Sequence, residues 1–528
     1  MSGLTNQTAA ILQEQTLTKV EPDPMSKKFY LELSPPSLLN NQADVDRLRD
    51  DLAPLAGHVT VPLALMNILP GVCRDGDWRV TVTLGRTTGG WALIGAEPGD
   101  TTARHFGLAV DVGTTTVVVY LVDLRSGDIL GVKADYNGQV VLGEDILTRI
   151  SVARKQEGAL ELRKAVLDTI NRLINDLAGD KEISTGEISA CAMGANSTMV
   201  HLLLGLEPNR ICKPPYIPVV NNPGLLAAGE VGLDIMPLAP VYFLPGVGSY
   251  VGGDVIGGVL VSGMYKSSEI TLFVDIGTNG EMILGNKDWL AACAGAAGPA
   301  LEGGVALSGM RAEPGAVEWV RLDPDTGRVK YRTIGGAKPR GICGSGLVDC
   351  LAEFLLAGII DLAGKFKDGG DYYVVAPATE TEHGMDIKVT QEDINNLLRT
   401  KGAVNAALEV LLDAVGYGAE DIKRFYAAGA FGQYLDLESA ITIGLYPDLP
   451  RDSMVRLGNS SGEGARQVLM SGQLRREAEK IATNITYFEL IANDMFVQKF
   501  SSSRFLPHTN LDYFPTVKAR LRERGIIT

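Results

Sequence analysis

The chain has 528 residues, 61 of them glycine, and its 63 acidic side chains outnumber the 48 basic ones to give a net charge of −15. This charge argues against nonspecific binding to nucleic acid or anionic lipid, and no apolar run approaches the ~20 residues of a membrane-spanning helix. The polar N-terminus lacks the basic and apolar blocks of a signal peptide. We expect a soluble, cytoplasmic protein that acts on small molecules or other proteins, not on nucleic acid or a membrane.

Six cysteines are spread over the chain, and no two of them form a Cys-x-x-Cys pair. They are too sparse for a disulfide framework. They also lack the ligand spacing of a zinc ribbon or a ferredoxin-type iron–sulfur domain. We therefore expect no iron–sulfur cluster in this chain.

Residues 1–28 form the first predicted segment, a disordered leader without a strong apolar period. A small α+β module follows over residues 29–104. Alternating apolar residues and stop signals predict its elements, which are strands at 29–33, 78–84 and 91–94 and a helix at 41–53.

Residues 105–528 alternate strands and helices, which favours an α/β fold of mostly parallel or mixed sheets covered by helices. We expect a first half over about 105–245 and a second half over about 246–460. Residues 461–528 complete the fold and carry no chemical motif of their own. A glycine- and alanine-rich loop is expected at 293–309, and the predicted helices are 145–155, 159–177, 198–204, 345–358 and 390–415.

The most informative stretch is a predicted hairpin whose turn carries Asp111, Gly113 and the run Thr114-Thr115-Thr116. Gly113 lacks the Cβ that would block a ligand, so backbone N–H groups and hydroxyls can reach phosphate oxygens. The Asp111 carboxylate can hold Mg²⁺ through water. One such turn is weak evidence, because Asp-Gly turns are common in hairpins.

The same pattern returns at Asp275-Ile276-Gly277-Thr278-Asn279. Two copies predict two similar half-domains whose turns grip the β- and γ-phosphates of a nucleotide. A third glycine turn, Gly429-Ala430-Phe431-Gly432, follows a strand and suits a flat adenosine ring lying against backbone. Together the three turns predict an ATP site in which Asp111 and Asp275 face Mg²⁺.

Carboxylates near these turns are candidates for orienting the water that attacks the γ-phosphate. Asp254 follows Gly252 and Gly253 at a predicted helix start, where the missing side chains let the backbone pass close to a ligand or another backbone. Glu144 and Asp145 follow shortly after the first hairpin. Helix N-capping is the alternative role for each of these acids.

This order of turns resembles the ATPase superfamily of actin, sugar kinases and heat-shock chaperones. The resemblance implies a duplicated actin-like ATPase fold, whose halves close over nucleotide. It also implies two connecting helices, which we expect at 194–204 and 345–358, with Asn196 near the cleft. Position by position, the nucleotide-binding residues it implies are Asp111, Gly113, Thr114, Thr115 and Thr116, then Asp275, Gly277, Thr278 and Asn279, then Gly429, Ala430 and Gly432.

At a finer level the chain is similar to the reductive activators of corrinoid proteins, from about residue 29 to its end. Several blocks carry this similarity. They include Pro35-Pro36-Ser37-Leu38, Asn137-Gly138-Gln139, Gly143-Glu144-Asp145-Ile146 with Arg149-Ile150, Gly194-Ala195-Asn196-Ser197-Thr198-Met199, and Phe505-Leu506-Pro507-His508-Thr509.

The resemblance implies an ATPase that reduces cob(II)alamin to cob(I)alamin in the corrinoid protein of a methyltransferase system. Members usually take the electron from an N-terminal iron–sulfur domain. Residues 1–28 are too short to form one, so we expect a separate, ferredoxin-like donor. A homodimer is also implied. Two alternatives stay open, namely a small-molecule kinase of the same superfamily and a nucleotide-gated binding or scaffold protein without a redox role.

Overall fold

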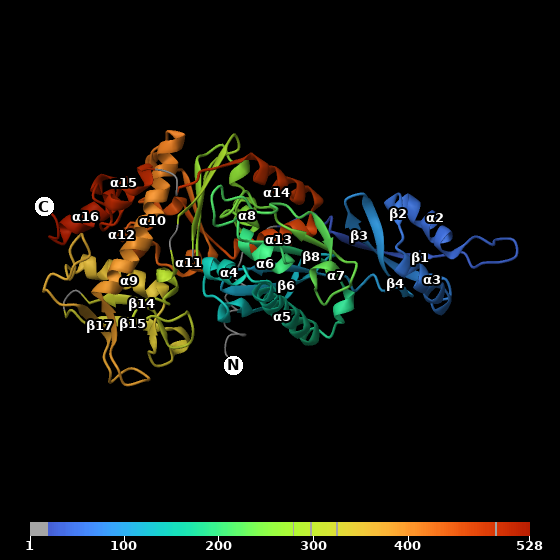
Figure 1. The fold of residues 1–528 in the computed structure, drawn as a ribbon, viewed down its shortest axis with the longest axis horizontal. Helices are drawn as coiled ribbons and strands as arrows, with labels where there is room; N and C mark the ends of the chain where they lie inside the picture. Colours follow the sequence, from blue (N-terminus) through green and yellow to red (C-terminus); the bar gives the residue numbers. More distant parts are fainter. Residues whose placement is uncertain (1–18, 278, 296–297, 324–325, 491–493) are drawn as a thin grey trace. The chain divides into compact units, whose positions relative to one another are not determined.

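The computed structural model describes residues 19–277, 279–295, 298–323, 326–490 and 494–528, which are drawn in colour in Figure 1. The chain divides into two compact units. Unit 1 contains the chain up to Val261 together with Ser460–Thr483. Unit 2 contains Ser262–Asn459 and Asn484–Thr528.

Unit 1 begins with the small α+β module. Its four-stranded sheet has the order β1-β3-β4-β2 and is covered by two helices (Figure 1). Alternating residues of β3, such as Val80 and Val82, are fully buried against Leu48 and Leu52 of α2. The elements are β1 (Ser26–Glu32), α2 (Asp44–Ala56), β2 (Val59–Thr60), α3 (Leu63–Asp75), β3 (Arg79–Thr87) and β4 (Gly90–Pro98).

The module starts earlier than predicted, because β1 begins at Ser26. Asp23 and Met25 donate backbone hydrogen bonds to Met470 and Leu469, and Met25 is fully buried. The last part of the predicted disordered leader is therefore ordered, whereas residues 1–18 lie outside the described residues. The helix α3 was not predicted.

A six-stranded mixed sheet forms the centre of unit 1, in the order β7-β6-β5-β8-β10-β9. β5 is antiparallel to β6, with Val112 opposite Val117, and parallel to β8. The predicted first hairpin is thus confirmed. The strands are β5 (Phe106–Val112), β6 (Thr116–Asp123), β7 (Ile129–Tyr136), β8 (Ile188–Ala195), β9 (Leu225–Ala227) and β10 (Pro240–Phe243).

Helices α5 and α13 lie on opposite faces of this sheet (Figure 1). Val110 and Val112 belong to the apolar core beneath α5. Successive side chains of a strand point to opposite faces, so Asp111 points toward the face that α13 covers. The helices of unit 1 are α4 (Ile146–Val152), α5 (Gln156–Asp180), α6 (Ser197–Leu204), α7 (Ala228–Val231), α8 (Gly253–Ser262), α13 (Ser460–Met470) and α14 (Gly472–Asn484).

Unit 2 contains a second six-stranded sheet, in the order β20-β19-β11-β12-β13-β21. β11 is antiparallel to β12 and parallel to β19. Read from β13 to β20, this order repeats the order from β7 to β10 in unit 1, which confirms the predicted duplication. The strands are β11 (Thr271–Ile276), β12 (Gly280–Gly285), β13 (Leu290–Gly295), β19 (Arg424–Ala428), β20 (Met454–Gly458) and β21 (Ile485–Tyr487).

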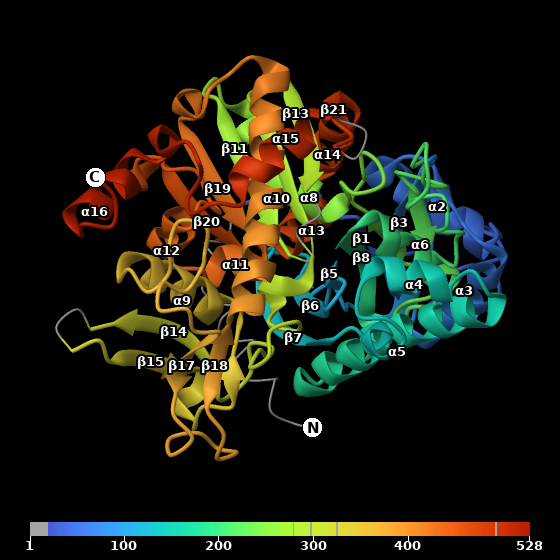
Figure 2. The same ribbon diagram turned by 60° about the vertical axis from the view of Figure 1, so that its left-hand side comes forward.

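Helix α10 packs against β12 and β13 of this sheet, whereas α9 packs mainly against β14, and both helices contribute to the apolar core of unit 2. The spacing of Thr390 and Asp393 in the sequence predicts a capping box at the start of the helix expected at 390–415, and the structure confirms this box at the start of α10. Two small sheets, β15-β14-β16 and β17-β18, lie side by side at one edge of unit 2 (Figure 2). Their strands are β14 (Ala316–Leu322), β15 (Val329–Thr333), β16 (Gly341–Ile342), β17 (Tyr372–Ala376) and β18 (Ile387–Thr390), and the helices are α9 (Gly344–Leu356), α10 (Gln391–Val415), α11 (Gly429–Tyr434), α12 (Leu437–Thr442), α15 (Asp494–Ser503) and α16 (Pro515–Glu523).

The prediction of two helices that connect the halves is wrong. The expected connecting helices, α6 and α9, each lie wholly within one unit, because their buried faces belong to the cores of unit 1 and unit 2 respectively. The chain instead changes units after Val261, Asn459 and Thr483, so α8, α13 and α14 stand at the crossings. The predicted loop at 293–309 begins too early, since Cys293 lies in β13.

Among the helices described, none combines the length and the apolar content needed to cross a bilayer.

Candidate functional site

The first turn, between β5 and β6, is closed by its own backbone. The Gly113 N–H donates a 2.9 Å hydrogen bond to the carbonyl oxygen of Thr116. A Cβ on Gly113 would lie 2.8 Å from that same oxygen, so no larger residue fits without a shift. Gly113 and the three threonines are partly accessible. The turn therefore presents hydroxyls on a fixed backbone, as a phosphate-binding turn requires.

The Asp111 carboxylate is held by a distant part of the chain. Ser461, in the first turn of α13, donates a 2.7 Å hydrogen bond from Oγ to Asp111 Oδ1. The helix can come this close because Gly194 on β8 has no side chain, and a Cβ there would lie 2.3 Å from Ser461 Oγ. The sequence of residues 461–528 showed no chemical motif, and the contact of Ser461 with Asp111 was not predicted. The local signal in the sequence was the run of small polar residues Asn459-Ser460-Ser461 at the start of the helix.

Asn196 lies beside the first turn. It caps α6, where its Oδ1 accepts a 2.9 Å hydrogen bond from Met199 N, and its Nδ2 donates to Thr114 Oγ1 at 3.1 Å. The expected close passage of Gly252 also occurs, against protein backbone, since a Cβ there would lie 2.5 Å from the Cα of Asn196. Gly253 packs in the same way against the carbonyl of Leu244.

Asp254 lies in the first turn of α8. Burial, aided by the negative charge of Asp111, raises the pKa of Asp254 to about 7. A carboxyl group that titrates near neutrality is suited to orient a water molecule and to accept its proton. Of the three predicted catalytic acids, Asp254 has the environment that best fits this role.

The other two acids lie at the start of α4. Asp145 caps this helix, because its two carboxylate oxygens accept 2.8 Å hydrogen bonds from the backbone N–H and the hydroxyl of Thr148. This is the alternative role foreseen for it. Glu144 is exposed.

The second turn, in unit 2, places two carboxylates together. Asp275 at the end of β11 lies directly opposite Glu281 on β12, and opposite residues of an antiparallel pair project to the same face. In unit 1 the residue opposite Asp111 is Val118. Sequence reasoning missed Glu281, although its place just after the hairpin turn was a usable signal. Gly277 N–H donates to the Asn279 carbonyl at 2.8 Å, and Thr278 lies outside the described residues.

The third turn lies against the second. Gly429 follows β19 with φ of +76°, and a Cβ there would lie 2.3 Å from Asp275 Oδ1. Glycine is needed at this position both for its backbone conformation and for the contact. Ala430 belongs to α11, and Gly432 packs closely on Ala427. Unit 2 therefore brings the predicted adenosine turn next to Asp275.

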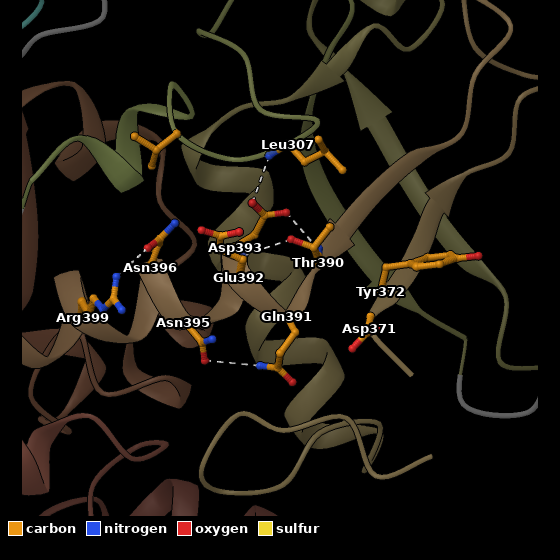
Figure 3. Close-up of a pocket in the computed structure, with 11 residues that line it drawn as sticks. Leu307, Asp371, Tyr372, Thr390, Gln391, Glu392, Asp393, Asn395, Asn396 and Arg399 are labelled. Atoms are coloured by element: carbon orange, nitrogen blue, oxygen red, sulfur yellow. Dashed lines mark hydrogen bonds between the residues drawn. The ribbon is translucent and has the colours of Figure 1, made fainter. Parts of the chain in front are cut away.

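A separate pocket of about 750 Å³ opens at the start of α10 in unit 2 (Figure 3). Figure 3 shows Thr390 bonded to Asp393, and the Asp393 carboxylate also accepts a 3.0 Å hydrogen bond from Leu307 N. These polar groups serve the helix cap. No predicted site residue lines this pocket, so we assign it no role in nucleotide binding.

Three family models match consecutive parts of the chain. Residues 15–103 match the RACo linker region, residues 106–267 match the RACo middle region, and residues 269–518 match the C-terminal domain of RACo, the ASKHA domain. The boundary between the first two models falls where the small module meets the six-stranded sheet of unit 1.

Similar proteins agree with these matches. The chain is 32% identical over 414 residues to the corrinoid activation enzyme RamQ of Eubacterium limosum, covering 75% of this chain and 69% of that protein. It is 25% identical over 412 residues to the [Co(II) methylated amine-specific corrinoid protein] reductase of Methanosarcina barkeri. This match covers 72% of this chain and 73% of that protein.

Among solved structures, one described as a reductive activator for corrinoid, iron–sulfur protein superposes with a TM-score of 0.86 at 43% identity. The match covers 94% of this chain and 81% of that one. The predicted α/β fold of actin-like ATPase type is thereby confirmed. The chain belongs to the RACo family, the reductive activators of corrinoid proteins.

Proposed function

We propose that this chain hydrolyses ATP and couples the hydrolysis to the reduction of cob(II)alamin to cob(I)alamin in the corrinoid protein of a methyltransferase system. The observation that carries the proposal is the pair of braced Asp–Gly turns. Asp111 is fixed by Ser461 in unit 1, and Asp275 is packed against Gly429 in unit 2. The similar proteins, described as a corrinoid activation enzyme, a corrinoid protein reductase and a reductive activator, support it.

The residues present fit ATP with Mg²⁺. Thr114, Thr115 and Thr116 are partly accessible on a closed turn, and their hydroxyl groups suit phosphate oxygens. The carboxylates of Asp111 and Asp275 are the proposed groups for Mg²⁺ bound through water, and Gly429 and Gly432 are proposed to bound the adenosine. ATP binding is proposed to close the two halves over the nucleotide.

Asp254 is proposed to orient the attacking water and to take its proton, so that ATP and water give ADP and phosphate. The cobalt reduction needs one electron, which a separate iron–sulfur protein is proposed to supply. The six cysteines are all free, which suits the reducing cytoplasm that we propose as the location. A homodimer remains the proposed assembly.

The nucleotide site is tested by Asp111→Asn and Asp275→Asn. Each variant should raise the Mg²⁺ concentration needed for half-maximal ATP hydrolysis by about 10–100-fold, the usual effect of losing a group that supports a metal. Asp176→Asn and Asp288→Asn change exposed carboxylates in the same two units and should leave hydrolysis unchanged. Full ATP affinity and turnover in both site variants would refute the site assignment.

The redox role is tested by following the cob(II)alamin absorbance of a purified corrinoid methyltransferase protein under anaerobic conditions. ATP, Mg²⁺ and titanium(III) citrate as external reductant should together produce cob(I)alamin, and omission of ATP should prevent it. If ATP is hydrolysed but no cognate corrinoid protein is reduced, the redox part of the proposal is wrong.

A further inference from the structure

The block Asn137-Gly138-Gln139 and the nearby Arg149 lie directly behind the first turn. The side chains of Asn137, Gln139 and Arg149 are all fully buried. Burying an amide or a guanidinium costs free energy unless it is hydrogen-bonded. These three side chains form a connected set of hydrogen bonds, and Asn137 joins that set to the backbone of the turn.

Asn137 grips the turn at two places. Its Nδ2 donates a 2.9 Å hydrogen bond to the carbonyl oxygen of Gly113, and its backbone N–H donates to the carbonyl of Thr115 at 2.8 Å. Its Oδ1 accepts a 3.0 Å bond from Gln139 N, which fixes the orientation of the amide. The donor group of Asn137 is thus directed at Gly113.

Gln139 and Arg149 connect Asn137 to other parts of unit 1 through hydrogen bonds. Gln139 Nε2 donates to the Leu162 carbonyl on α5 at 2.9 Å, and Gln139 Oε1 accepts from Arg149 Nη1 at 3.1 Å. Arg149 Nε donates a 2.7 Å bond to the carbonyl of Gly143. The chain of buried polar groups therefore runs from the turn to α5 and to the segment before α4.

The peptide between Gly113 and Thr114 links the hydrogen bond from Asn137 to phosphate binding. The C=O and N–H of a trans peptide point in opposite directions, so holding the Gly113 carbonyl toward Asn137 turns the Thr114 N–H away from the buried network. We propose that Asn137 is a positioning residue for the phosphate turn. By holding the Gly113 carbonyl, it orients the Thr114 N–H toward a phosphate oxygen. This inference rests on the proposed ATP site. Without Asn137 the peptide can rotate and present its carbonyl oxygen to the phosphate, which is repulsive.

The test compares Asn137→Ser and Asn137→Asp with Asn171→Ser. Asn171 makes the same kind of contact elsewhere in unit 1, since its Nδ2 donates to the Gly232 carbonyl and its Oδ1 accepts from Asp234 N, both at 2.9 Å. ATP affinity is measured by calorimetry, and binding of adenosine, which lacks phosphate, by saturation-transfer NMR. Thermal unfolding is recorded for every variant.

We expect both Asn137 variants to bind ATP about tenfold or more weakly and adenosine as the unchanged chain does. Asn137→Asp should bind ATP more weakly than Asn137→Ser, because a carboxylate then faces the Gly113 carbonyl oxygen. Asn171→Ser should change neither affinity. Should the Asn137 variants fail to fold, Gln139→Met loosens the same network from behind and is expected to weaken ATP binding selectively.

Absence of ATP binding in the unchanged chain would refute the proposed function itself. ATP binding that survives in the unchanged chain and in both Asn137 variants would overturn this inference alone. An equal loss of ATP and adenosine affinity, or the same loss in Asn171→Ser, would reduce the role of Asn137 to general stability and would also overturn it.

Discussion

Ser461 Oγ donates a 2.7 Å hydrogen bond to Asp111 Oδ1, although the two residues are 350 positions apart in the sequence. The bond ties the acid of the first turn to the segment Ser460–Thr483, which returns to unit 1 after the chain has built most of unit 2. The geometry of the first turn therefore depends on the correct return of α13, and Asp111 cannot be considered part of a purely local hairpin.

Ser461→Ala should weaken nucleotide binding. A hydrogen bond to a charged group contributes about 1.5–3 kcal/mol, so we expect the ATP concentration for half-maximal hydrolysis to rise by about tenfold or more. Ser460→Ala is the matched control, because the neighbouring Ser460 hydroxyl is buried and has no hydrogen-bond partner among the residues that the structure describes. Equal kinetics in the two variants would show that the Ser461–Asp111 bond does not matter for the site.

Gly429→Ala should disturb the second and third turns together. The added Cβ meets Asp275 Oδ1 at 2.3 Å in a backbone conformation with φ of +76°. Gly416→Ala has the same backbone strain, at φ of +75°, but its added Cβ has no atom of the described residues within 4 Å. Both variants should lose stability in urea unfolding, by about 1–3 kcal/mol from the backbone, and only Gly429→Ala should lose ATP affinity. A loss of affinity in both would indicate a stability effect.

Asp254 should make the protein less stable as the pH rises from about 4 to about 7. The folded protein holds the Asp254 proton up to a pKa of about 7, raised by burial and by the charge of Asp111, whereas the unfolded chain loses it near the ordinary value of about 3.9. The folded state binds more protons in this window, so its stability falls with rising pH. Each pKa unit corresponds to about 1.4 kcal/mol.

Asp254→Asn removes this titration. The variant should therefore be more stable than the unchanged chain at pH 8, and the difference should shrink toward pH 4. Urea unfolding in the absence of nucleotide at pH 5, 6, 7 and 8 measures it. A pH-independent difference would contradict the raised pKa. ATP hydrolysis should fall in the same variant if Asp254 orients the water.

His105 should have the opposite effect at acid pH. Burial, followed by the charge of Lys28, lowers the pKa of His105 to about 4. Its Nε2 lies 2.9 Å from Ser26 Oγ, which in turn lies 2.7 Å from Ser189 Oγ. Between the unfolded value of about 6.5 and the folded one, the unfolded chain binds more protons. Stability therefore falls as the pH falls through this range.

His105→Gln keeps a polar side chain and removes the titration, so its unfolding midpoint should depend less on pH between 6.5 and about 4. The exposed His58 is the control, and His58→Gln should keep the acid sensitivity of the unchanged chain. If both variants retain that sensitivity, a group other than His105 causes it.

The sequence alone was sufficient for features that depend on neighbouring residues. The apolar runs that flank Asp111 and Asp275 predicted both hairpins, and their repetition predicted the duplicated sheets. The Thr390 and Asp393 spacing likewise predicted the cap of α10. Such features are encoded by side-chain period and by residues within one turn of each other, so packing elsewhere in the chain does not change them.

The tertiary structure decided which groups surround the two acids. Strand register set Glu281 beside Asp275, and burial beside Asp111 set the pKa of Asp254. Close helix packing brought Ser461 to Asp111, because Gly194 leaves room for the serine and Gly464 lets α13 cross α8 at Gly257. These contacts join residues far apart in the sequence through space left by missing side chains, and no local pattern around Asp111 or Ser461 contains that information.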